Sequence, residues 1–102
     1  LTVIVDYNKL QSLDSTDNTI TLEPFADKWK SFGWNVSECD GHNHTELKTA
    51  LNIQSNKPKV IIAHTIKGYG VSFMENQVLW HYRSPQGQEY NDAIKEVENN
   101  EK

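Results

Sequence analysis

Residues 59–64 read Lys-Val-Ile-Ile-Ala-His, a run with four consecutive apolar residues that follows Pro58. The run is too uniformly hydrophobic for a strand with one face in water, so it predicts a central strand of a parallel sheet. Residues 1–5, Leu-Thr-Val-Ile-Val, predict a second strand that is buried on both faces. Because such a strand needs neighbours on both sides, we expect the natural chain to begin further upstream.

The rest of the sequence predicts three helices, one more strand and two loops. A short amphipathic helix is expected from Pro24 to Gly33, a half-buried strand over residues 34–39, and a second helix from Thr45 to Ser55. Residues 9–22 and 65–85 are expected to be loops, and residues 90–97 a C-terminal helix that frays from Glu98 onward. This order predicts an α/β fold, a parallel sheet with flanking helices.

Aromatic residues recur at helical spacing in the first predicted helix. Phe25, Trp29 and Phe32 lie on one face, and Trp34 follows. Such residues form either a partner-binding patch or part of the core, and the spacing favours packing against the sheet.

The composition limits the class of protein. The chain has 102 residues, a length typical of one domain, and its 10 basic and 14 acidic residues give a net charge of −4, which argues against nucleic-acid binding. No apolar run approaches the roughly 18 residues of a membrane span, so we expect a soluble, non-exported chain with no membrane partner. The single cysteine, Cys39, excludes an internal disulfide and favours a cytoplasmic location.

The charge is distributed unevenly along the chain. Between residues 57 and 83, the basic residues Lys57, Lys59, Lys67 and Arg83 and the acidic residue Glu75 give +3. The rest of the chain, with six basic and thirteen acidic residues, carries −7. This asymmetry predicts a local anion-binding site on an otherwise acidic protein.

In a parallel α/β sheet, ligands bind beyond the carboxyl ends of the strands. After the first strand, Asn8 brings an amide oxygen, and the residues around it bring free backbone carbonyls, which are ligand types for Mg²⁺ or Ca²⁺. The alternative is an ordinary turn, because Asn favours turns through local hydrogen bonds. The pattern leaves both interpretations open.

Two further residues are candidates for contact with a ligand. Lys67 precedes Gly68, so an ammonium group and an accessible backbone could approach a phosphate together, although the order is not that of a P-loop. The alternative is a solvated lysine. His81 lies between Trp80 and Tyr82, where it is either a titratable group of a site or a structural histidine of an aromatic cluster.

The other three histidines predict no site of their own. We expect His64, at the end of the apolar run, to be buried and hydrogen-bonded to backbone. His42 and His44 have a spacing that could hold zinc, but no cysteine pair or third ligand is near them, so zinc binding is not favoured. No nucleophile motif of a hydrolase is present in the sequence.

Taken together, these stretches resemble the thiamine diphosphate-binding domain of transketolases, most closely the N-terminal subunit of the two-chain bacterial enzymes. The matching strings are Val-Ile-Val-Asp-Tyr-Asn-Lys-Leu-Gln at 3–11, Leu-Glu-Pro-Phe-Ala-Asp-Lys-Trp at 22–29, Phe-Gly-Trp at 32–34, Asp-Gly-His at 40–42, residues 57–68, Gly-Val-Ser-Phe-Met-Glu-Asn at 70–76 and Trp-His at 80–81. The resemblance implies that residues 1–102 are the C-terminal portion of this domain, without the upstream Gly-Asp-Gly half of its metal motif.

The resemblance also implies roles for single residues. Asn8, through its side chain, and Leu10, through its backbone carbonyl, would bind the divalent ion, Mg²⁺ or Ca²⁺, that holds the cofactor diphosphate. Lys67 would contact the diphosphate. His81 would contact the diphosphate and lie at the substrate entrance, as the catalytic residue of these segments. Residues 68–76 would form a loop that closes over the cofactor.

The implied reaction is transfer of a two-carbon ketol unit from a ketose phosphate to an aldose, in carbohydrate metabolism of the pentose phosphate type. The implied partners are sugar phosphates and a pyrimidine-binding domain or C-terminal transketolase subunit, in a homodimer or a heterotetramer. Because the pyrimidine-binding part and its glutamate lie outside these residues, we expect no turnover from residues 1–102 alone.

Other functions stay open at this point. Tyr82 stands where the family usually has glycine, and Arg83 adds a cation, so the usual acceptor specificity does not follow from the resemblance. One alternative is another thiamine diphosphate enzyme of the deoxyxylulose-phosphate synthase type, although Trp80-His81 and residues 23–27 favour transketolase. The other alternative is a non-catalytic interaction module with the same half-fold.

Overall fold

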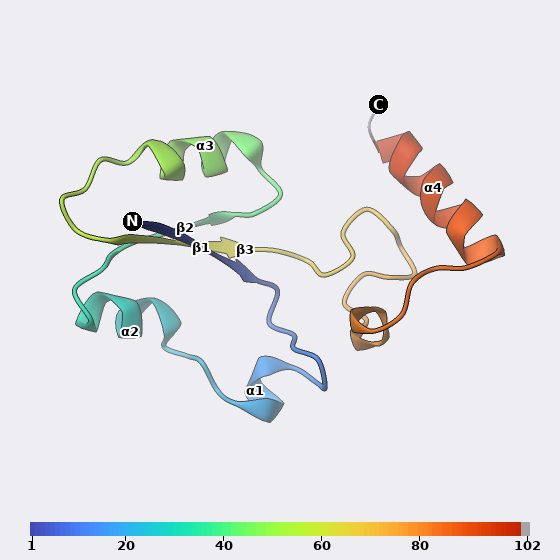
Figure 1. Ribbon diagram of the computed structural model, residues 1–102, viewed down its shortest axis with the longest axis horizontal. Coiled ribbons are helices and arrows are strands. Elements are labelled where there is room, and N and C mark those ends of the chain that lie inside the picture. Colours follow the sequence, from blue (N-terminus) through green and yellow to red (C-terminus); the bar gives the residue numbers. More distant parts are fainter. Residues whose placement is uncertain (101–102) are drawn as a thin grey trace.

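The computed structural model describes residues 1–100. Its centre is a parallel three-stranded sheet in the order β1-β3-β2, formed by β1 (Thr2–Tyr7), β2 (Asn35–Asp40) and β3 (Lys59–His64) (Figure 1). Because β3 has a strand on each side, Val60, Ile61 and Ile62 are fully buried. The predictions of an α/β fold and of a central parallel strand at 59–64 are therefore confirmed.

Two helices cover the two faces of the sheet, α2 (Phe25–Ser31) on one side and α3 (His44–Asn52) on the other (Figure 1). On the α2 face, the rings of Phe25 and Trp29 pack against the buried residues Tyr7, Val60 and Ile62. The core of the α3 face consists of four buried residues: Cys39, Ala50, Ile61 and Ala63. Phe25 and Trp29 thus form core, as their helical spacing predicted.

The third aromatic residue of the predicted face behaves differently. Phe32 is the residue at which α2 ends, and its side chain is 83% exposed. The chain leaves the helix there, and Gly33 adopts a φ of 85° that turns it toward β2. The expectation that Phe32 packs into the core was therefore wrong, because the helical period no longer applies at its position.

The first strand differs from its prediction in a similar way. Exposure alternates along β1, with Ile4 52% exposed while Val3 and Val5 pack toward α2. Within residues 1–100, β1 is an edge strand, and α3 covers the β2 and β3 part of the opposite face. The expected burial on both faces is thus found for β3 but not for β1.

Local hydrogen bonds set the beginnings of the helices. α3 is capped by Asn43, whose Oδ1 accepts hydrogen bonds from the backbone N–H groups of Thr45 and Glu46, so the expected cap at Thr45 was two residues late. A short helix that the sequence did not indicate, α1 (Thr16–Thr19), lies in the expected loop 9–22. Its cap is Ser15, which accepts from the N–H of Asn18.

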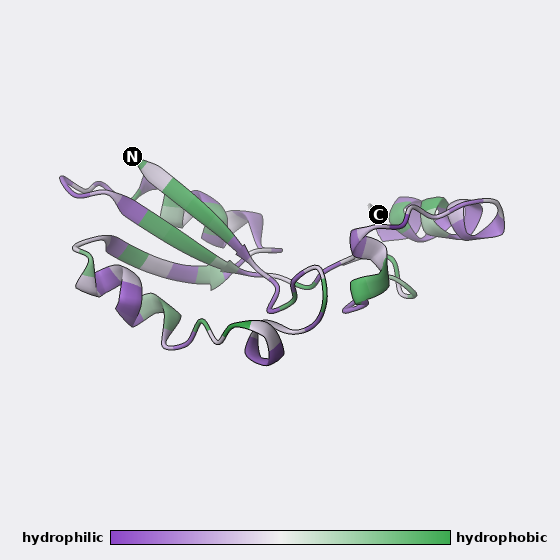
Figure 2. Ribbon diagram, turned by 60° about the horizontal axis from the view of Figure 1, so that its bottom comes forward, coloured by the Kyte–Doolittle hydropathy of each residue, from purple (hydrophilic) through white to green (hydrophobic). Residues whose placement is uncertain are grey.

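The segment after β3 lies beyond the carboxyl ends of the strands (Figure 1). It contains the 3₁₀ helix η1 (Val78–His81), inside the expected loop, and α4 (Gln88–Asn100). The helix continues through Glu98–Asn100, where fraying was expected; residues 101–102, for which fraying was also expected, lie outside the described residues. α4 lies apart from the sheet, and Figure 2 shows hydrophilic residues along much of its length. Among the described residues, no helix is long and apolar enough to cross a membrane.

Candidate functional site

The candidate site lies at the carboxyl edge of the sheet, where the ends of all three strands meet. The register aligns Tyr7, His64 and Asp40, so the residues that follow each strand leave the sheet side by side. Direct bonds join these exits, because the hydroxyl of Thr65 donates to the carboxylate of Asp6. The N–H of Gly41 donates to the carbonyl of His64 at 2.8 Å.

Asn8 follows β1 in a tight local turn. Its Oδ1 accepts a hydrogen bond from the N–H of Leu10 at 3.0 Å, and Lys9 between them has a φ of 61°. The turn interpretation is therefore confirmed as local geometry. It does not exclude a ligand role, because an amide oxygen has a second lone pair.

Leu10 continues this turn toward α1. It forms an isolated antiparallel bridge with Ser15, made by hydrogen bonds of the flanking residues Lys9 and Gln11, so the Leu10 carbonyl is not used by the bridge. The turn thus presents an amide oxygen and a carbonyl oxygen two residues apart. Both are hard oxygen donors of the kind that Mg²⁺ and Ca²⁺ prefer, so the residues present fit such an ion.

The described residues do not form a metal site on their own. Within residues 1–100, no three His, Cys, Asp or Glu side chains gather closely enough to hold a metal ion. An ion at Asn8 and Leu10 would need further oxygen ligands from outside this set, because Mg²⁺ and Ca²⁺ take six or more.

Lys67 lies on the segment that leaves β3, and its backbone is held in a compact loop. Its carbonyl accepts from the N–H of Asn76 at 2.9 Å. Gly68 has a φ of 72°, and a Cβ there would lie 2.6 Å from the Met74 carbonyl oxygen. Glycine is therefore required by close backbone contact across the loop.

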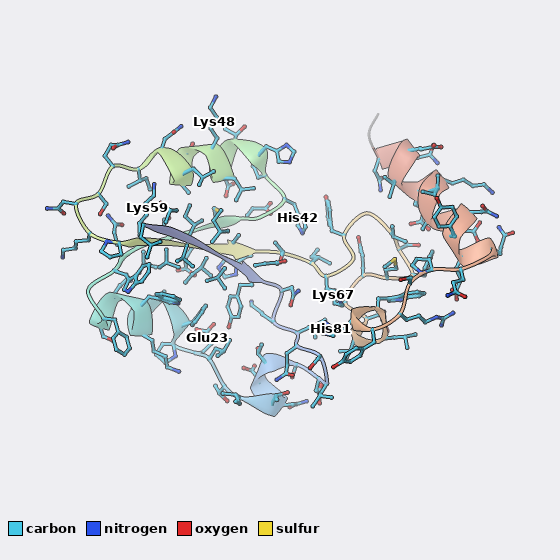
Figure 3. All side chains as sticks on the ribbon, viewed as in Figure 1. Glu23, His42, Lys48, Lys59, Lys67 and His81 are labelled. Carbon is cyan, nitrogen blue, oxygen red and sulfur yellow. The ribbon has the colours of Figure 1, made fainter. Side chains whose placement is uncertain are left out.

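The side chain of Lys67 is half-buried, and within residues 1–100 it makes no ion pair. Figure 3 shows Lys67 and His81 beyond the carboxyl ends of the strands, on the side toward α4. The structure therefore brings the turn at Asn8 and Leu10 and the loop at Lys67 to the same edge of the sheet, from the adjacent strands β1 and β3.

His81 ends η1 and is exposed, with its ring edge-on to Tyr82 at 4.7 Å between centroids. The preceding Trp80 is anchored, because its Nε1 donates to the carbonyl of Phe73 at 3.1 Å. This bond ties η1 to the loop that carries Lys67. The imidazole is consequently available to a ligand instead of being enclosed in an aromatic cluster.

The basic stretch from 57 to 83 does not form one cluster. Lys59 opens β3 at the opposite end of the sheet, where its Nζ donates to the carbonyl of Ile53 at 2.9 Å. Arg83 contacts both carboxylate oxygens of Glu89 at 2.7 Å and lies over the Trp80 ring. The basic residues that give the stretch its net charge of +3 are thus spread over the structure. Of these residues, Lys67 brings an ammonium group to the candidate site.

Two histidines at this edge have contacts that the sequence did not indicate. His64 was expected to be buried and bonded to backbone, and this was wrong. Its Nε2 lies 3.0 Å from the Glu38 carboxylate, and the side chain is partly exposed. His42 accepts a hydrogen bond at Nε2 from the N–H of Ile66 at 2.8 Å. In the sequence, His42 could have been found from the string Asp-Gly-His at 40–42, which is one of the strings that carry the family resemblance.

A polar contact near the carboxyl end of β1 joins this strand to the start of α2. The Tyr7 hydroxyl donates to Glu23 at 2.7 Å, and the other Glu23 oxygen accepts from the N–H of Phe25 at 3.0 Å. Burial, followed by the Glu23 carboxylate, raises the pKa of Tyr7 to about 12. The Phe25 N–H and then the Tyr7 hydroxyl lower the pKa of Glu23.

The family profile described as "Transketolase, thiamine diphosphate binding domain" matches residues 1–98 of this chain. The chain belongs to this transketolase family. The family relation agrees with the resemblance in the motifs, and it shows a transferase family with a thiamine diphosphate-binding domain.

Individual members of the transketolase family agree. An apulose-4-phosphate transketolase subunit of Phocaeicola vulgatus is 37% identical over 100 residues, and its counterpart in Actinobacillus succinogenes is 40% identical over 99; each alignment covers 95% of this chain. 6-Deoxy-6-sulfo-D-fructose transketolase subunit SqwG of Clostridium sp. is 38% identical over 101 residues, 96% of this chain. The alignments cover 36%, 36% and 37% of these relatives, so the chain spans little more than a third of their length.

Proposed function

We propose that residues 1–102 are the C-terminal portion of a thiamine diphosphate-binding domain and supply part of its diphosphate and metal site. The parent enzyme would transfer a two-carbon ketol group from a ketose phosphate to an aldose acceptor. One observation carries the proposal: β1 and β3 bring two oxygen donors and an ammonium group without an ion partner among residues 1–100 to the same sheet edge. A diphosphate bridged by a divalent ion needs both kinds of group.

The residues of this chain have separate tasks in the proposed site. Asn8 and Leu10 would hold Mg²⁺ or Ca²⁺ through oxygen, in a turn whose shape the Asn8–Leu10 hydrogen bond already sets. Lys67 would offset the charge of the diphosphate, and its half-buried position weakens screening by water. Bound thiamine diphosphate would supply the electron sink for carbon–carbon bond cleavage.

His81 is the proposed catalytic residue. Its exposed ring at the end of η1 can exchange hydrogen bonds with the diphosphate or with a substrate oxygen, while the Trp80–Phe73 bond keeps η1 against the loop. An imidazole can both donate and accept a hydrogen bond. It can therefore contact a substrate oxygen both while that oxygen is a hydroxyl and while it is a carbonyl.

The remaining groups of the site would come from outside these residues. Relatives that are named as subunits of a transketolase suggest a partner subunit, which we propose to be a C-terminal transketolase subunit or a pyrimidine-binding domain, in a heterotetramer or homodimer. The proposed substrates are sugar phosphates, and the proposed location is the cytoplasm. Arg83, the cation that the usual family pattern lacks, is paired with Glu89 in this chain.

Calorimetric titration of the full-length protein and its partner with thiamine diphosphate and Mg²⁺ tests the proposal. Binding should weaken by at least about 10-fold in Asn8→Ala, which loses both the ligand oxygen and the turn. Asn8→Asp keeps an oxygen at this position and should bind within about threefold of the wild type. Asn91→Ala, an exposed asparagine on α4, is the matched control.

The outcomes separate this function from its alternatives. No binding by the wild-type assembly, or equal binding by Asn8→Ala, would contradict the proposed site and favour a non-catalytic interaction module. If binding is as expected, product analysis with xylulose phosphate and with pyruvate as donors separates transketolase from a deoxyxylulose-phosphate synthase. Turnover with pyruvate alone would contradict the transketolase assignment.

A further inference from the structure

We propose that His42 is a positioning residue that sets the backbone at Ile66 and thereby the place of Lys67 at the anion site. In this role His42 acts as a hydrogen-bond acceptor. The functional part of the proposal rests on the proposed diphosphate contact of Lys67, whereas the structural part does not.

The contact between His42 and the exit of β3 has two components. Nε2 of His42 accepts the N–H of Ile66 at 2.8 Å. Its ring also stacks on Tyr69, with centroids 3.8 Å apart and planes 17° from parallel. The first component requires an unprotonated Nε2, which places the ring proton on Nδ1, and the second requires only a flat ring.

The turn that carries His42 is itself fixed against β3. The N–H of Gly41 donates to the carbonyl of His64, and a Cβ at Gly41 would lie 2.4 Å from Cγ2 of Thr65. The N–H of His42 donates to Oδ1 of Asp40 at 2.8 Å. Hence His42 reaches Ile66 from a rigid base at the end of β2, and any side chain at position 41 would push this base away.

The consequence for Lys67 follows from the backbone hydrogen bonds on its two sides. On its N-terminal side, the Ile66 carbonyl accepts from the N–H of Tyr69 at 3.2 Å, and the N–H of Ile66, one peptide earlier, donates to His42. On its C-terminal side, the Lys67 carbonyl accepts from the N–H of Asn76 at 2.9 Å. Removal of the His42 bond leaves the N-terminal side of Lys67 held by the bond between Tyr69 and the Ile66 carbonyl alone, so that the ammonium group can shift. A displaced ammonium group then loses alignment with a bound anion, because charge-assisted contacts depend on distance and direction.

Three variants of the full-length protein, in complex with its partner, separate the two components. His42→Phe keeps a flat ring for Tyr69 but has no acceptor, whereas His42→Gln brings an oxygen acceptor and has no ring. His44→Gln is the matched control, because His44 is an exposed histidine two residues further on, at the start of α3. The readouts are hydrogen exchange at the Ile66 amide and the affinity for thiamine diphosphate with Mg²⁺ by calorimetry.

We expect His42→Phe to speed exchange at Ile66 by about 10-fold and to weaken cofactor binding by about 5- to 10-fold, the effect of one lost hydrogen bond. His42→Gln should stay within about threefold of the wild type in both readouts, and His44→Gln should match the wild type. If His42 served only as a structural aromatic ring, His42→Gln would not restore exchange and binding.

Unchanged exchange at Ile66 in His42→Phe would overturn the proposal. A His42→Gln variant as impaired as His42→Phe would overturn it as well, because the ring and not the acceptor would then matter. Faster exchange with unchanged cofactor affinity would refute the link to Lys67. If the wild type binds no thiamine diphosphate, the proposed function fails, and the exchange data alone then decide whether His42 sets Ile66.

Discussion

The sheet body, residues 1–64, and the segment after β3, residues 65–100, are held together by different forces. In the body, Val60, Ile61 and Ile62 are fully buried between α2 and α3. In residues 65–100, the buried hydrophobic residues are Val71 and Ala93. There the loop is tied to α4 by polar bonds, in which the Glu96 carboxylate accepts from Ser72 and the Asn100 amide donates to the Gly70 carbonyl.

The two regions therefore have different roles. Apolar burial is strong but not directional, so the body supplies stability without specifying the position of any single polar group. Hydrogen bonds are weaker but directional, so the segment places Lys67 and His81 accurately while it can open locally. Two of the proposed site residues, Lys67 and His81, thus lie on the part of the molecule with the smaller core, whereas Asn8 and Leu10 follow β1 in the body.

The largest expected effect tests whether the body carries the stability. Ile62→Ala in the full-length protein should lower the free energy of unfolding by about 2–5 kcal/mol, and Ile62→Val by about 0.5–1.5 kcal/mol, because the lost contacts and the cavity grow with the atoms removed. Urea unfolding followed by tryptophan fluorescence measures both. Equal effects of the two variants would mean that Ile62 lies in a loosely packed site, contrary to its full burial.

The second effect tests whether the segment opens independently of the body. Glu96→Ala removes both hydrogen bonds to Ser72, at 2.6 Å and 2.9 Å. Exchange of the Ser72 amide should become about 10- to 100-fold faster, as expected for loss of bonds to a charged group. The free energy of global unfolding should stay unchanged.

Glu98→Ala is the control for this experiment, because Glu98 is an exposed carboxylate on the same helix. It should leave both the Ser72 amide and global stability unchanged. A fall in global stability in Glu96→Ala as large as the local effect would show that body and segment unfold as one unit.

The smallest effect tests a polar bond within the body. Tyr7→Phe removes the 2.7 Å hydrogen bond to Glu23 and should lower the free energy of global unfolding by about 1 kcal/mol. The expected loss is global, unlike that of Glu96→Ala, because Tyr7 is part of the buried cluster under α2. A purely local change near Glu23, seen by hydrogen exchange, would contradict the comparison.

The same variant has a pH signature. Because the pKa of Tyr7 is raised to about 12 from its ordinary 10.0, the neutral phenol is favoured in the folded state. This stabilisation is complete below pH 10 and is lost as the pH rises from about 10 to about 12. The wild type should therefore lose stability relative to Tyr7→Phe in this range, as measured by unfolding at each pH.

Much of the body could be predicted from local sequence. The four consecutive apolar residues of β3 admit little except a central strand, and Pro24 and Gly33 bracket α2. The ends of the helices and the exposure of single side chains were less predictable, because they depend on which elements pack beside them. Ile4 is exposed since α3 covers β2 and β3 instead of β1, and Phe32 is exposed since its helix ends there.

The sequence predicted that the candidate residues share one edge of the sheet, but it did not predict the hydrogen bonds and ion pairs there. Asn8 and Lys67 follow two apolar runs, and the rule for parallel sheets places both at one edge. No sequence pattern showed that Arg83 is paired with Glu89, or that Lys59 binds carbonyls near the end of α3. Charge counted along the chain therefore overstated the positive charge at the site.

The α/β class, the central strand and the residues that resemble a thiamine diphosphate site follow from the sequence, because periodicity and motifs are properties of short stretches. Which charged side chains are paired depends on the folded arrangement, and so does the hydrogen bond that joins His42 to Ile66 across 24 residues of sequence. Hydrogen bonds between distant segments require that the strands first align in parallel. That alignment arises from burial of the whole sheet, and no local pattern records it.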